Sequence, residues 1–165
     1  MSTQATSASG ANTTKDILAL VGWLAACFLA ALGGVFVSTG DWYTSLNKPS
    51  WNPPSWLFGP VWTTLYCMMA VAAWQVWRVG GWQRQRIALS LFVAQLVLNA
   101  LWTPIFFGAH QMGWAFVEIC MLWLALVATI GAFWKVKPSA ALLLLPYLAW
   151  SSFAAVLNFT LWRMN

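Results

Sequence analysis

Two rows of polar side chains interrupt otherwise apolar stretches of the sequence. Gln95, Asn99 and Thr103 repeat every four residues, a spacing that puts them on one face of a helix. A second row recurs at spacings of four, three and four, and consists of Tyr147, Ser151, Ala154 and Asn158. Amide, hydroxyl and phenol groups hydrogen-bond either to a ligand or to a neighbouring helix. Both interpretations, a binding cavity and a polar seam between helices, stay open on these rows alone.

Tryptophans accompany both rows. Seven of the 14 tryptophans lie near the ends of apolar stretches, which is typical of the aromatic belt at a membrane surface. Four lie deeper, at about 8 to 16 Å along their segments for a rise of 1.5 Å per residue: Trp62, Trp102, Trp123 and Trp150. Flat apolar rings at matched depth favour a slot for a flat ligand.

Other reactive side chains are few. Glu118 is an acid within an apolar stretch, so it is either a functional group or a carboxyl that pins two helices together. His110 is the single histidine, and Cys27, Cys67 and Cys120 are scattered through apolar segments. We therefore expect neither a metal site nor a disulfide framework.

Composition defines the elements that must position these groups. Of 165 residues, 61% are hydrophobic and only 7% are charged, and the mean hydropathy is +0.71. These values exclude an ordinary water-soluble fold and a disordered chain. The net charge of +5 forms no basic stripe, so no nucleic-acid partner is expected. The sequence predicts an all-α membrane protein.

Five apolar stretches are long enough to cross a bilayer. They predict one five-helix domain over residues 17–165, preceded by a disordered tail over residues 1–16. The predicted spans cover residues 17–38, 56–77, 87–107, 112–134 and 139–161. Six Lys and Arg residues flank the spans on the N-terminal side and two on the other side, which places the N-terminus inside. We expect a multi-pass protein of a bacterial membrane.

The long connection over residues 39–55 is predicted to be a lid above the polar rows. Pro49, Pro53 and Pro54 stiffen it. Its functional candidates are Trp42, Tyr43, Lys48 and Trp51. Lys48 is placed to pair with an anionic group of a ligand.

Three backbone features shape the predicted bundle. Pro104 and Pro146 each remove a helical hydrogen bond and predict kinks beside the proposed slot. The first span carries small residues at every fourth position, which serve either a homodimer or packing within the chain. They are Gly22, Ala26, Ala30 and Gly34.

The sequence resembles the family of tryptophan-rich sensory proteins and translocator proteins (TspO), once called peripheral benzodiazepine receptors. The resemblance runs from about residue 17 to the end of the chain. The segments that carry it are Trp42-Tyr43, Lys48-Pro49-Ser50-Trp51-Asn52-Pro53-Pro54, Gly59-Pro60-Val61-Trp62, Leu65-Tyr66, Gln95-Leu96, Asn99, Trp102, Pro104-Ile105-Phe106-Phe107-Gly108, Gln111-Met112-Gly113-Trp114, Pro146-Tyr147, Trp150 and Leu157-Asn158-Phe159.

The resemblance implies a five-helix bundle, usually a homodimer, whose ligand pocket is closed by the first loop. Members of that family bind porphyrins such as protoporphyrin IX and haem as ligands, and no cofactor is required. By motif, the implied pocket residues are Tyr43, Trp62, Asn99, Trp102, Trp114, Trp150 and Ala154. The family's sterol motif is incomplete here, because Phe159 replaces its tyrosine, so we do not expect high-affinity sterol binding.

Three functions follow from the resemblance. The first is a receptor or regulator that binds porphyrins and related flat hydrophobic ligands in a pocket under the first loop and is linked to tetrapyrrole metabolism or stress signalling. The second is a photo-oxidative enzyme that degrades porphyrins, with Trp62 and Trp150 as candidate catalytic residues. The third is a transporter of tetrapyrroles or sterols. The sequence itself shows no hydrolytic machinery.

Overall fold

The protein is seen in a computed structural model that describes residues 3–35 and 40–165, with side chains described for residues 13–32 and 41–165. Within these ranges the chain is helical and contains no strand. The elements are α1 (Thr3–Val35), α2 (Gly40–Ser45), α3 (Ser55–Arg78), α4 (Gly81–Arg84), α5 (Arg86–Thr103), the π-helix η1 (Pro104–Gly108), α6 (Met112–Val136), α7 (Pro138–Leu143) and α8 (Leu145–Met164).

The prediction of five membrane spans is confirmed. The stretches long and apolar enough to cross a bilayer are Thr13–Leu32, Ser55–Arg78, Arg86–Gly108, Met112–Val136 and Pro138–Met164. The predicted end of the first span, residues 36–38, and the predicted first residue of the lid, residue 39, lie outside the described residues.

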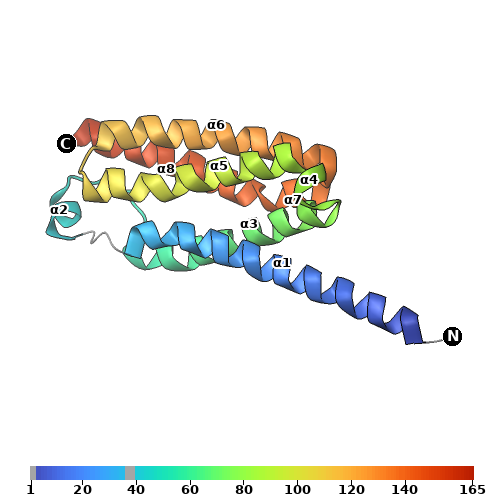
Figure 1. Ribbon diagram of the computed structural model, residues 1–165. Coiled ribbons are helices and arrows are strands. Elements are labelled where there is room, and N and C mark those ends of the chain that lie inside the picture. The colour runs from blue at the N-terminus through green and yellow to red at the C-terminus, as the bar shows by residue number, and fades with distance from the viewer. Residues whose placement is uncertain (1–2, 36–39) are drawn as a thin grey trace.

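The five spans form a closed ring. Helix α1 packs against α3 and α5, α5 packs against α6, and α6 packs against α7 and α8. Contacts between α3 and α7 complete the ring. Figure 1 shows α2 and the C-terminus at one end of the bundle, which we call the lid end, and α4 and the N-terminus at the other, which we call the basic end. The interior of this ring is where the polar rows must lie.

Small residues close the ring near the basic end. Ala72 and Ala73 of α3 and Ala140 and Ala141 of α7 are completely buried. Small side chains let helix backbones approach closely, which stabilises helix pairs in a membrane. A hydrogen bond from Ser139 Oγ to an amide of α3 adds to this contact.

Two prolines interrupt their spans, as predicted. At Pro104 the third span changes from α5 to η1, where Ala109 N–H donates to the Pro104 carbonyl at 2.8 Å. At Pro146 the fifth span divides into α7 and α8 at Leu144. Proline lacks the N–H that an uninterrupted α-helix needs, so the backbone adopts a different local pattern.

The N-terminal segment differs from its prediction. We expected a disordered tail over residues 1–16, but α1 begins at Thr3 and extends outward from the bundle (Figure 1). Residues 1–2 lie outside the described residues. Nucleation is the step of helix formation with the largest unfavourable free energy, and the membrane span already supplies the nucleus. Further turns can therefore be added to this helix at little cost in free energy. Asp16 fixes the helix where it leaves the bundle, through Arg78 at 3.1 Å and through a carbonyl that accepts from Trp74 Nε1 at 2.9 Å.

Candidate functional site

Asn99 lies at the centre of a hydrogen-bond network that joins three spans. Its Oδ1 accepts from the Tyr66 hydroxyl of α3 at 2.7 Å, and its Nδ2 donates to the Tyr147 hydroxyl of α8 at 2.8 Å. All three side chains are buried. The polar row of α5 thus points into the ring, as its spacing predicted.

Trp62 lies against this network. Its ring stacks on Tyr66 with centroids 5.4 Å apart and meets Tyr147 edge-on at 6.1 Å. The sequence interpretation identified Trp62 but gave no role to Tyr66. The signal was present, because Tyr66 follows Trp62 by four residues and so lies on the same helix face.

A second network lies closer to the lid end. Trp102 Nε1 donates to Asn158 Oδ1 at 3.1 Å, and Asn158 Nδ2 donates to the Met112 carbonyl at 2.8 Å. These bonds join α5, α8 and the start of α6. They also orient the Trp102 ring, which stacks on Phe106 with centroids 4.8 Å apart and planes 18° apart.

The π-helix presents two phenylalanines to the lid. Trp42 of α2 meets Phe106 at 5.7 Å, and Tyr43 meets Phe107 at 5.3 Å, both edge-on. His110 has a positive φ of 56°, and its ring stacks on Trp42 at 4.1 Å. The predicted lid therefore does cover the end of the third span. Phe106, Phe107 and His110 were not predicted as lid contacts, because the π-turn that aims them leaves no periodic pattern in the sequence.

Further aromatic rings form the wall on the side of α8. Trp150 lies between Phe58 of α3 at 5.8 Å and Phe153 of its own helix at 5.5 Å. Trp51 of the lid meets Phe153 at 5.8 Å. Helix α3 and helix α8 are thus bridged by aromatic side chains at this level, while Ala154 packs half-buried against the main core.

The lid has its own internal bonds. Lys48 Nζ donates to the Thr44 and Leu46 carbonyls at 3.1 and 3.2 Å and lies over the Tyr43 ring at 4.8 Å. A lysine there satisfies free carbonyls at the end of α2. The Tyr43 hydroxyl donates to Asn52 at 3.3 Å. Burial raises the pKa of the Tyr43 phenol, opposed by the hydrogen bond to Asn52, so this phenol stays neutral and able to donate at pH 7.

The lid is also tied to the C-terminal residue. Asn47 N–H donates to Asn165 Oδ1 at 2.8 Å, and Asn165 Nδ2 donates to the Asn47 carbonyl at 3.1 Å. We expect Asn165→Ala to increase amide hydrogen exchange of residues 46–48 severalfold with little change in thermal unfolding, because exposed hydrogen bonds contribute only about 1 kcal/mol. The matched control is Asn12→Ala, a change outside the lid. Unchanged exchange of these amides would show that the tie does not hold the lid.

Two predicted residues lie outside this constellation. Trp114 is 68% exposed, so the structure places it on the outer surface of the bundle and not among the buried pocket candidates. Trp123 points to α8, where its Nε1 donates to Ser152 Oγ at 2.8 Å. The position of Trp123 deep within its span is therefore explained by a contact between α6 and α8. Trp62 and Asn99 belong to the first network and Trp102 to the second, while Tyr43 contacts Phe107 from the lid and Trp150 belongs to the wall on the side of α8.

Two buried polar side chains have no hydrogen-bond partner among the described residues. They are Gln95, which is completely buried one turn below Asn99, and Glu118 of α6, which is 6% exposed. An unpartnered buried amide or carboxyl costs roughly 1–3 kcal/mol or more. Within the described residues the Glu118 carboxyl therefore makes no hydrogen bond that would pin α6 to a neighbouring helix.

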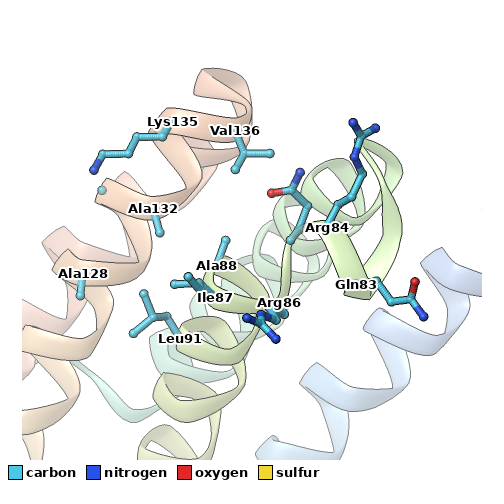
Figure 2. A pocket seen from close by; sticks show the side chains of 12 residues that line it. Gln83, Arg84, Arg86, Ile87, Ala88, Leu91, Ala128, Ala132, Lys135 and Val136 are labelled. Atoms are coloured by element: carbon cyan, nitrogen blue, oxygen red, sulfur yellow. The ribbon is translucent and has the colours of Figure 1, made fainter.

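Cavities occur outside the aromatic layers. One of about 530 Å³ runs beside α1 and is lined by Gly22, Trp23 and Trp77, among others. Another, of about 660 Å³, opens between α5 and α6 at the basic end (Figure 2). Below the lid, ring contacts fill much of the space, so a large ligand there would require the lid rings to separate.

Comparison with known proteins agrees with this architecture. Residues 19–163 match the TspO/MBR family. The translocator protein of Homo sapiens is 49% identical over 126 residues, which cover 75% of each chain. Protein CrtK of Rhodobacter capsulatus is 40% identical over 147 residues, covering 87% of this chain and 90% of the relative. The tryptophan-rich sensory protein of Cereibacter sphaeroides is 42% identical over 143 residues, covering 87% and 89%. A match of this extent, on a five-span bundle, shows that the chain is a multi-pass integral membrane protein that belongs to the TspO/MBR family.

Proposed function

We propose that this protein is a membrane receptor or regulator that binds porphyrins below its lid and links their level to tetrapyrrole metabolism or stress signalling. The observation that supports the proposal is the convergence of aromatic rings from the lid, α3, η1 and α8 on one part of the bundle. A porphyrin is flat and apolar on both faces, so stacked and edge-on rings are its natural contacts.

The polar groups fit the rest of such a ligand. The unpartnered Gln95 amide and the Asn99 network offer hydrogen bonds in the interior. Lys48 of the lid is our candidate cation for the acidic side chains of protoporphyrin. In the described structure its ammonium group binds lid carbonyls, so it would exchange these for a carboxylate on binding. Such an exposed pair adds only up to about 1 kcal/mol.

Equilibrium binding tests this proposal. Protoporphyrin IX titrated into the purified protein in detergent should quench tryptophan fluorescence with saturation at one ligand per chain and shift the porphyrin absorbance band. Uroporphyrin, which carries eight carboxylates on the same ring, should not bind in an apolar slot. Quenching that never saturates, or that uroporphyrin reproduces, would mean partition into detergent or surface binding and would refute the proposal.

A porphyrin-degrading enzyme is a second candidate. It is favoured by the stacking of Trp62 on Tyr66, whose hydroxyl continues through Asn99 to Tyr147, because these are oxidisable rings in direct contact. Illumination of the complex in the presence of dioxygen as the oxidant should then consume the porphyrin and form a degradation product. Loss of that product in Trp62→Phe with binding retained would separate catalysis from capture, whereas equal turnover in both proteins would exclude a role for Trp62.

A further inference from the structure

A groove at the basic end is independent of the site below the lid. It has a volume of about 660 Å³ and lies between the start of α5 and the last turns of α6. Figure 2 shows its small apolar side chains facing one another across the gap, with Ala128 and Ala132 on one side and Ala88 and Leu91 on the other. Ala128 and Ala132 are one helical turn apart, so the apolar floor runs along the spans towards the membrane interior.

Cations stand at the mouth of this groove. Arg84 ends α4, Arg86 begins α5, and Lys135 lies in the last turn of α6. In Figure 2 Lys135 and Arg84 lie on opposite sides of the gap, and the charged ends of both side chains extend outward from it. All three side chains are exposed. The rim is therefore positively charged while the floor is apolar.

The chain has no carboxylate available to neutralise this rim. It contains three acidic residues in total. Asp16 binds Arg78 at 3.1 Å, Asp41 lies in α2 at the lid end, and Glu118 is buried within α6. Among the side chains that the structure describes, the pair between Asp16 and Arg78 is the one ion pair. Charge complementarity thus calls for an anion from outside the chain.

We propose that this groove binds an anionic phospholipid, with its phosphate headgroup at the Arg84, Arg86 and Lys135 rim and an acyl chain along the apolar floor. The rim coincides with the ends of two membrane spans, where lipid phosphates lie. A free phosphate would use the cations and leave the apolar floor unfilled. A lipid uses both, because basic pockets between membrane helices combine headgroup attraction with chain burial.

Lipid titration of the full-length protein, followed by native mass spectrometry, tests the cation rim. Phosphatidylglycerol should bind, and phosphatidylcholine with the same acyl chains should bind much more weakly. Arg84→Gln together with Lys135→Gln should weaken phosphatidylglycerol binding by about twenty-five-fold, at roughly fivefold for each cation near the surface. The control is Lys137→Gln with Arg163→Gln, which removes the same charge from outside the groove and should change binding by less than threefold. An equal loss in both double variants would overturn the proposal in favour of diffuse surface charge.

A substitution at Gly131 distinguishes the binding of a lipid from the binding of a free phosphate. Gly131 lines the groove, and a Cβ built on it meets nothing within 4 Å, so a side chain can be added at this position. Gly131→Leu should fill the floor and weaken phosphatidylglycerol binding at least tenfold without lowering the unfolding temperature, since leucine also favours a helix. Inorganic phosphate at millimolar concentration should not displace the lipid. Unchanged lipid binding in Gly131→Leu, or displacement by phosphate, would overturn the assignment to a phospholipid.

Discussion

Asn99→Leu is expected to lower the free energy of unfolding by about 2–4 kcal/mol, because it leaves two buried phenol hydroxyls without their hydrogen-bond partner. Leucine is close to asparagine in size, so the change removes hydrogen bonds with little change in packing. The hydroxyls of Tyr66 and Tyr147 would each lose their bond to Asn99, at 2.7 and 2.8 Å. Thermal unfolding in a mild detergent measures the effect. Porphyrin affinity should fall with it, since these side chains support Trp62.

A double-mutant cycle provides the control. If Asn99 acts through its two partners, Tyr66→Phe and Tyr147→Phe should each lower stability less than Asn99→Leu. Adding Asn99→Leu to a protein that already carries both tyrosine substitutions should then lower the free energy of unfolding much less than Asn99→Leu does alone. In that protein no phenol hydroxyl is left without a partner. Additive losses, or an Asn99→Leu protein as stable as the wild type, would show that the network does not hold the three spans together.

The second large effect is expected in ligand affinity. Trp62→Ala combined with Trp150→Ala should weaken protoporphyrin IX binding by about tenfold to a hundredfold, since each aromatic contact contributes roughly 0.5–1.5 kcal/mol beyond its buried area. The same fluorescence and absorbance titration measures it. Circular dichroism must show that the double variant keeps its helical content.

Exposed tryptophans give a matched control for that experiment. Trp114 and Trp134 are 68% and 52% exposed, so Trp114→Ala with Trp134→Ala removes as many indole rings without touching the proposed site. We expect less than a threefold change in affinity. A larger loss in this control than in the Trp62 and Trp150 double variant would place the ligand on the lipid-facing surface.

The spans could be predicted from the sequence because their signals are local. A stretch of apolar residues long enough to cross the bilayer is readable residue by residue, and four of the predicted spans agree closely with α3, α5 to η1, α6, and α7 to α8. Proline likewise acts locally, which is why both interruptions were predicted. The helical tail from Thr3 was not predicted, because its polar composition carries no periodicity. Its helix instead continues from the adjoining span, which supplies the helix nucleus.

The residues that contact each other between neighbouring helices could not be predicted from the sequence. The four-residue spacing put Asn99 on an inward face, yet nothing local specifies that its partners are Tyr66 and Tyr147. Trp123 illustrates the same difficulty, since its depth resembles that of Trp62 while its indole bonds Ser152. Depth in the membrane is a local property, whereas the facing residue depends on the order of the helices in the ring.

The seam and cavity interpretations of the polar rows both describe part of the molecule. Asn99 and Asn158 join helices by hydrogen bonds, as a seam requires. Gln95 and Glu118 make no such bonds within the described residues, so a seam does not account for them. The aromatic rings of η1 are covered by Trp42 and Tyr43 of the lid, a contact that a seam between spans does not require.

A structure of the protein with protoporphyrin IX bound tests the central claim most directly. The account predicts the macrocycle beneath α2, with its faces against Trp62, Trp102 and Trp150 and the rings of Trp42 and Phe106 moved apart to admit it. A macrocycle found outside the helical ring, against the lipid-facing rings of Trp114 or Trp134, would contradict the account.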